Sequence, residues 1–105
     1  MSGRKAGVNM TANTNTNIYS PGGSTLGTYF LSIANRNASG SVRVRAGLSA
    51  TFGTLDWNTD TLQPDTSLNA GAVLEIGPIV AAGANAIVGH ADGTGCTFLL
   101  TGVEQ

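Results

Sequence analysis

Charged residues are scarce in this chain. Five Lys or Arg and six Asp or Glu make up 10% of its 105 residues, whereas an average globular protein carries about 25%. The net charge is −1, which argues against a nucleic-acid partner. Polarity comes instead from Thr, Ser, Asn and Gly, and burying such a surface requires few ions to be desolvated. The composition therefore favours association with other protein surfaces.

Cysteine is almost absent, since Cys96 stands alone and excludes an internal disulfide. Its neighbours Gly95 and Thr97 supply no basic group to activate a thiol, so we expect a small buried hydrophobic residue. A chain of this length buries roughly 60–65% of the surface that its unfolded form exposes. One domain with a core that needs neither a disulfide nor a metal is therefore expected.

Long apolar runs are also missing. The longest mainly apolar stretch, Ile76–Val88, is interrupted by Gly77 and Pro78 and is too short to span a bilayer. Arg4 and Lys5 give a basic start, but polar residues follow where a signal peptide would be apolar. We therefore expect synthesis in a cytoplasm and no membrane partner.

The first sixteen residues contain an Asn/Thr alternation and little that a core would bury. Such segments bury too little apolar surface to offset the conformational entropy that they lose on becoming ordered. The predicted organisation is thus a flexible N-terminal arm over 1–16 and a β-sandwich domain over 17–105. Two roles for the arm stay open, an idle disordered end or an arm that orders against a neighbouring subunit.

From residue 17 onward the apolar pattern has a period of two, which predicts strands. In Thr28–Asn35 the residues Tyr29, Leu31 and Ile33 share one face. In Ser41–Ser49 apolar and polar residues alternate most clearly, which indicates a strand with one face exposed to solvent. Further strands are expected at Ile18–Tyr19, Ala72–Ile76, Ala86–Ala91 and Cys96–Val103, the last apolar on both faces and therefore central in its sheet.

Three segments between these strands are assigned by turn signals. Gly77-Pro78 is expected to bend the chain, and Asp92–Gly95 to form a hairpin turn. Thr51–Asp65 is interpreted as a long connection with one short strand and with Trp57 over the core. No amphipathic helix is visible. The fold class is all-β, a single β-sandwich, Ig-like or jelly-roll-like; a small barrel is the alternative.

Catalytic and metal sites are not expected. Asp56-Trp57-Asn58-Thr59-Asp60 has the oxygen spacing that opens a calcium loop, but Thr61 and Ser67 stand where Gly and Glu are required. His90, the only histidine, has no Gly-x-Ser-x-Gly nucleophile elsewhere in the chain and too few partners for zinc. No cofactor is predicted either, because no phosphate-binding glycine motif precedes a helix.

Four residues are candidates for an interface. Arg43 and Arg45 share the wet face of one strand, and with Arg36 they are hypothesised to form a basic strip. That strip is interpreted as a solvated face, with an inter-subunit salt bridge as the other interpretation. Trp57 is the one aromatic residue suited to stack against a sugar ring.

The chain resembles small β-sandwich structural proteins of tailed bacteriophage virions, of the decoration, neck or tail type. The resemblance covers roughly residues 7–105 through short motifs. They are Ile18-Tyr19-Ser20-Pro21-Gly22-Gly23, Leu31-Ser32-Ile33-Ala34-Asn35-Arg36-Asn37, Val42-Arg43-Val44-Arg45-Ala46, Leu74-Glu75-Ile76-Gly77 with Ala82-Gly83, and Thr101-Gly102-Val103-Glu104-Gln105.

This resemblance implies a virion component without enzymatic activity. We therefore expect a homo-oligomeric, multicopy capsid decoration or tail assembly module whose partners are itself and other virion proteins. The alternative function is a carbohydrate-binding host-attachment module of a tail fibre, with a surface glycan as its partner. Exposed loops on β-sandwiches often carry such sites.

Overall fold

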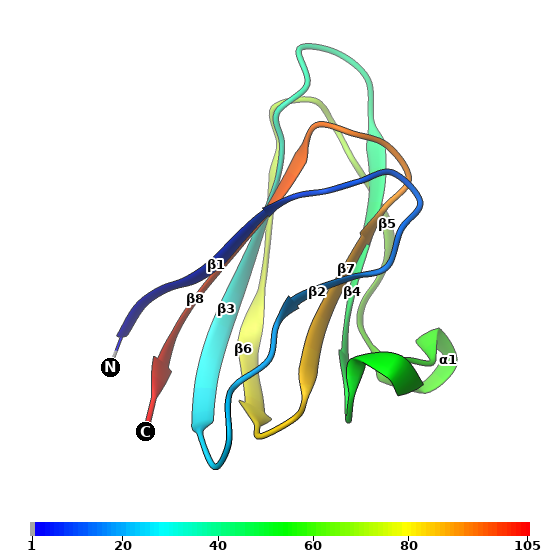
Figure 1. The fold of residues 1–105 in the computed structure, drawn as a ribbon. Helices are drawn as coiled ribbons and strands as arrows, with labels where there is room; N and C mark the ends of the chain where they lie inside the picture. The colour runs from blue at the N-terminus through cyan, green and yellow to red at the C-terminus, as the bar shows by residue number, and fades with distance from the viewer. Residues whose placement is uncertain (1) are drawn as a thin grey trace.

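Two antiparallel four-stranded sheets pack face to face in the computed structural model, which describes residues 2–105 (Figure 1). The first sheet, sheet A, has the strand order β1-β8-β3-β6, and the second, sheet B, has the order β2-β7-β4-β5. The strands are β1 (Ser2–Asn9), β2 (Thr16–Tyr19), β3 (Leu26–Asn35), β4 (Val42–Ser49), β5 (Thr61–Leu68), β6 (Val73–Ala82), β7 (Ala86–Ala91) and β8 (Cys96–Glu104).

The strands pair in a nested pattern. The first pairs with the eighth, the second with the seventh, the third with the sixth and the fourth with the fifth. Two further pairings, β3 with β8 and β4 with β7, complete the sheets. This is the strand order of an eight-stranded jelly roll, in which one long hairpin is wrapped into two sheets. In an Ig-like sandwich the first two strands would be neighbours in one sheet.

The core lies between the sheets and follows the two-residue period that the sequence predicts. Tyr29, Leu31 and Ile33 of β3 are all at most 1% exposed, which confirms the predicted inward face. On β4, Val44 and Ala46 are fully buried. The β-sandwich expected from the sequence is therefore confirmed, and its core is aliphatic with two large rings, Tyr29 and Phe98.

The last strand confirms two expectations. Cys96 at its start is fully buried and unpaired, and burial is the main reason that the pKa of its thiol is raised. Strand β8 lies between β1 and β3, so a strand that is apolar on both faces does occupy an interior position of its sheet.

The predicted N-terminal arm takes a different form over most of its length. Ser2–Asn9 is not separate from the domain, because it forms β1 and pairs with β8 at the edge of sheet A. Ala6 and Val8 pack against the core and Met10 is 3% exposed, so the segment buries more than its Asn/Thr content indicates. Met1 lies outside the described residues.

The connection after β4 is more regular than expected. It holds a 3-10 turn η1 (Phe52–Thr54) and one helical turn α1 (Trp57–Asp60), and β5 then runs for eight residues in place of one short strand. Pro64 lies inside β5. A proline is tolerated there because β5 is an edge strand, where one row of N–H groups needs no partner.

Two predicted turns are corrected. Asp92–Gly95 does not close a hairpin, because β7 belongs to sheet B and β8 to sheet A, so this turn crosses between the sheets. Gly77-Pro78 does not divide β6, which continues from Val73 to Ala82 with a register shift opposite Phe30. Asp92–Gly95 does change the direction of the chain, but the partners of the strands on either side of it are set by tertiary packing.

Candidate interaction surfaces

The outer face of sheet B is covered by the chain itself. Val88 and Ala86 of β7 pair with Gly47 and Ser49 of β4. The side chains of Val88 and Ala86 point to the outer side of the sheet, yet both are fully buried. The connection that carries η1 and α1 lies over them, with η1 against β7 and α1 against β4. The part of this face around Ala86 and Val88 is therefore covered and is not a free surface.

Trp57 forms the centre of this cover. Its ring lies 4.4 Å from the Arg45 guanidinium carbon and makes an edge contact with His90 at 6.4 Å between centroids. Its indole Nε1 donates a hydrogen bond to Asn15 Oδ1 at 3.2 Å. The side chain is half-buried and packs on the outer side of sheet B.

This arrangement does not favour Trp57 as a sugar platform. A sugar ring stacks on a free aromatic face, and here the Arg45 guanidinium occupies one. Arg45 Nε is buried, and residues 2–105 offer it no hydrogen-bond acceptor, so the cation–π contact is its main compensation. Removing Arg45 from the indole to admit a sugar would lose that contact.

The three arginines do not form one strip. Arg43 pairs with Asp65 at 2.9 Å on sheet B, both side chains being half exposed. Arg36 follows β3 on sheet A, where it donates to Thr97 Oγ1 at 2.6 Å and to Asn9 Oδ1 at 2.8 Å. Arg43 and Arg45 therefore lie on one sheet and Arg36 on the other, and each has its own partner within the chain.

His90 lies beside Arg45, its cross-strand neighbour. Burial is the main cause that lowers the pKa of His90 below 6.5, and the charge of Arg45 lowers it further. The unfolded chain therefore binds this proton more readily than the folded protein. Stability consequently falls as the pH drops from about 6.5 through the lower folded pKa.

We expect Arg45→Met to raise the pKa of His90 toward 6.5, because the positive charge leaves while the aliphatic stem remains. The pKa should not return fully to 6.5, since burial is the larger cause of its lowering. An NMR titration of the single imidazole measures it directly. Arg43→Met is the matched control, and an unchanged His90 pKa in Arg45→Met would contradict the electrostatic coupling.

The acidic turn after η1 uses its carboxylates to hold its own backbone. Asp56 Oδ1 accepts a hydrogen bond from Asn58 N, and Asp60 Oδ2 accepts one from Asp56 N. This is the surface turn expected from the sequence. Over residues 2–105 no three His, Cys, Asp or Glu side chains come together as metal ligands. In the same part of the chain, no helix is long and apolar enough to cross a membrane.

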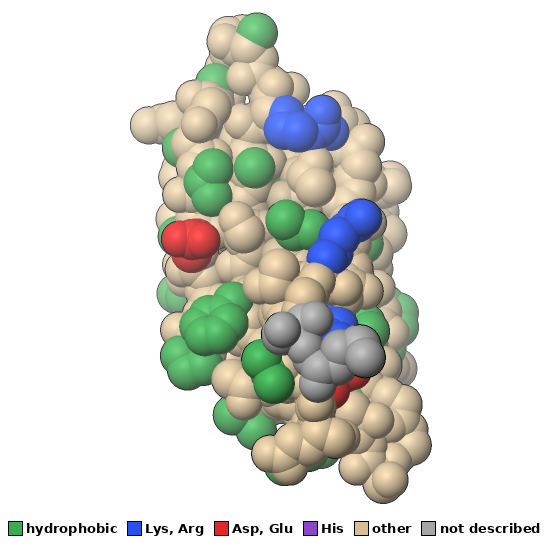
Figure 2. Space-filling model, turned by 90° about the vertical axis from the view of Figure 1, so that its left-hand side faces the viewer, with side chains coloured by type: hydrophobic (Ala, Val, Ile, Leu, Met, Phe, Trp, Pro, Cys, Tyr) green, Lys and Arg blue, Asp and Glu red, His purple; other side chains and the backbone are tan. Residues whose placement is uncertain are grey.

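The outer face of sheet A differs from that of sheet B, because no helix or loop element of residues 2–105 packs over it. Figure 2 shows apolar side chains spread over this face, with basic groups toward one side, an acidic group on the other side and a further acidic group beside the basic ones. Six of the large exposed hydrophobic residues belong to its strands: Leu26, Phe30, Val73, Val80, Leu99 and Val103. We call this the sheet A face.

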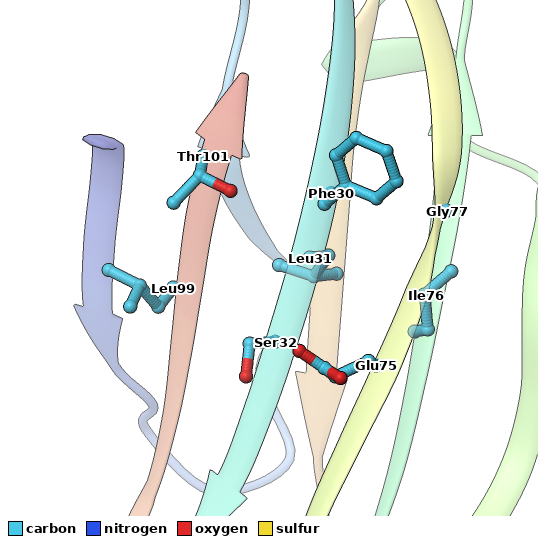
Figure 3. A pocket seen from close by; sticks show the side chains of 8 residues that line it. All are labelled: Phe30, Leu31, Ser32, Glu75, Ile76, Gly77, Leu99 and Thr101. Carbon is cyan, nitrogen blue, oxygen red and sulfur yellow. The ribbon is translucent and has the colours of Figure 1, made fainter. Parts of the chain in front are cut away.

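A hollow of about 500 Å³ lies in the middle of the sheet A face (Figure 3). Phe30 on β3, Glu75 and Gly77 on β6, and Leu99 and Thr101 on β8 surround it. The Phe30 ring leans over Gly77, whose missing Cβ would lie 2.8 Å from Phe30 Cδ1. The hollow is therefore open above Ser32, the small residue between Leu99 and Glu75.

Sequence reasoning missed this surface. The signal was present, since Phe30 interrupts the polar face of Thr28–Asn35 and Leu99 gives β8 a second apolar face. Leu99 is assigned to a central strand from the sequence, and no prediction makes use of Phe30. Comparison of the chain with known protein families, curated proteins and solved structures finds no match.

Proposed function

We propose that this chain is a non-enzymatic structural protein of a tailed bacteriophage virion, present in many copies and attached through the sheet A face. The observation that carries the proposal is the contrast between the two outer faces. The chain covers sheet B with its own connection and leaves six large hydrophobic side chains exposed on sheet A. A gathering of large exposed apolar side chains on one face favours an interaction site there.

The energetics support attachment through this face. Phe30 is 52% exposed, Val80 60% and Val103 54%, and full burial of such side chains stabilises a complex by about 1.5–3 kcal/mol each relative to full exposure. Few ions are lost from water when the face is covered, because Glu75 and Arg4 are the charged residues closest to its centre. A jelly roll is also an architecture of viral capsid proteins, although a fold alone does not fix a function.

The proposal is tested on particles from the producing strain. Mass spectrometry of purified virions should find this chain in many copies per particle. Absence of the chain from intact particles would overturn the proposal. A search of both particles and lysate distinguishes absence from poor expression.

The role of the sheet A face is tested with variants of the same gene. We expect Phe30→Asp to lower incorporation into particles at least about tenfold, because burying an unpaired carboxylate opposes docking. Leu62→Asp is the matched control, since Leu62 is 39% exposed on β5 of sheet B. Equal incorporation of both variants would show that attachment does not use the sheet A face.

A further inference from the structure

We propose that the partner on the sheet A face is a second copy of this chain, related by a twofold axis that runs parallel to the strands between β8 and β3. This inference rests on the proposed function for the surface, and it adds the partner and the geometry. Its basis is a row of side chains across the four strands of sheet A. When a second copy is rotated by 180° about this axis, its row faces the first row and the side chains that meet are complementary.

The row carries opposite charges at its two ends. Glu75 on β6 is opposite Ser32, Ser32 is opposite Leu99, and Leu99 is opposite Gly7 on β1. The space that a Cβ would take at Gly7 is filled by the guanidinium of Arg4, which folds back over it. At one height along the sheet the order is therefore Arg4 guanidinium, Leu99, Ser32 and Glu75 carboxylate.

A twofold rotation about the proposed axis exchanges β1 with β6 and β8 with β3. It places the Arg4 guanidinium of each copy over the Glu75 carboxylate of the other. Two equivalent ion pairs form at the rim, as an isologous interface requires. Among residues 2–105 the ion pairs are Lys5–Glu104 and Arg43–Asp65, so neither Arg4 nor Glu75 has to give up an internal ion pair.

The same rotation matches large side chains with small ones. Leu99 of each copy lies over Ser32 of the other, where the hollow is open. Phe30 lies over Thr101 of the other copy, because these two residues are also opposite each other within the sheet. Each projecting side chain thus meets a short one, and no pair of bulky residues has to interpenetrate.

The face has the size that such an interface needs. Four strands spaced about 4.8 Å apart, with about eight residues each at about 3.4 Å, cover about 500 Å². Two copies therefore bury about 1,000 Å² or more, the lower range of specific interfaces.

Edge-to-edge association is disfavoured as an alternative. Strand β6 is an edge strand and carries Pro78 and a register shift, and strand β1 has a shift between Arg4 and Ala6. Proline and bulges at sheet edges block the addition of a further strand. Face-to-face packing remains for a second copy.

The inference is tested by sedimentation velocity over a concentration series on the full chain and four variants. We expect the wild type to dimerise at micromolar concentration. Arg4→Glu and Glu75→Arg each place like charges opposite each other twice, and each should raise the dimer Kd at least about tenfold. Combining the two substitutions restores opposite charges, so the double variant should return to within about threefold of the wild type.

Arg43→Glu on sheet B is the control for a general charge effect and should leave the Kd unchanged. A wild type that stays monomeric at about 100 μM, or a double variant as weak as either single one, would overturn the inference. The proposed function fails separately. If the wild type is monomeric while Phe30→Asp still blocks incorporation, only the dimer is wrong; if dimers form but particles lack the chain, only the virion role is wrong.

Discussion

Replacing Phe98 with Ala is expected to lower the free energy of unfolding by about 3–5 kcal/mol. Phe98 on β8 is fully buried, and its ring crosses the sandwich to Gly89 of β7, whose missing Cβ would lie 2.6 Å from Phe98 Cε2. The ring is therefore the contact that fills the space between the sheets at this point. Glycine has no side chain that can move into the cavity left by truncation, so relaxation is limited and the cost is high.

Urea denaturation followed by circular dichroism measures this loss. Because a domain of this size is stable by about 5–15 kcal/mol, Phe98→Ala should remain folded at low temperature with a much lower midpoint. Phe52→Ala is the matched control, since Phe52 is 42% exposed on η1 and should cost below about 1 kcal/mol. Equal midpoints for the two variants would contradict the role of Phe98.

Replacing Tyr29 with Phe is expected to lower the urea midpoint at neutral pH, because the mutation removes a hydrogen bond to a charged carboxylate. The Tyr29 hydroxyl donates to Glu104 Oε2 at 2.8 Å, and Tyr19 donates to the same oxygen at 2.6 Å. Lys5 Nζ lies 3.4 Å from the other carboxylate oxygen. One carboxylate near the end of β8 thus joins β1, β2 and β3.

The loss in Tyr29→Phe should depend on pH. Hydrogen bonds from Tyr19 and then Tyr29 lower the pKa of Glu104 below its ordinary value of 4.5. The stability that this carboxylate provides is therefore present above about pH 4.5 and is lost as the pH falls through the lower folded pKa. Denaturation midpoints of Tyr29→Phe and the wild type should converge in acid.

Glu104→Gln is the control for this pH dependence, because it keeps the shape of the side chain and removes its titration. The stability gap between Glu104→Gln and the wild type should close over the same acid range. A Tyr29→Phe penalty that stays constant from neutral pH to pH 3 would show that the hydroxyl acts through packing and not through the Glu104 carboxylate.

The sheet architecture was predictable from the sequence where alternation is uninterrupted. Leu26–Asn35 alternates between buried and less buried residues along its length, and Val42–Arg45 does so at the start of β4, so a period of two identifies both as strands. The Asn/Thr-rich beginning of the chain was not predictable in this way. Its pairing with β8 depends on a strand nearly ninety residues later, and no local pattern reports such a partner.

The surfaces were less predictable, since each depends on which sheet a strand joins. Arg36 and Arg43 are close in sequence but lie on opposite sheets. Phe30 has the residue type of a core side chain, yet its neighbours Tyr29 and Leu31 are the ones that point inward. The row from Arg4 to Glu75 depends on the register of three strand pairs. Composition and periodicity carry no information about that register.

The nested pairing also constrains how quickly the native state is reached. Strands β4 and β5 are consecutive in the chain and can meet early, whereas β1 and β8 meet only after nearly the whole chain has been brought together. Closing large loops before their contacts form costs entropy, so folding from the innermost hairpin outward should be slow, on the millisecond-to-second scale. Until β8 inserts between β1 and β3, the chain exposes the unpaired edges of both strands and the apolar face of the sheet, and refolding yields should therefore fall as protein concentration rises.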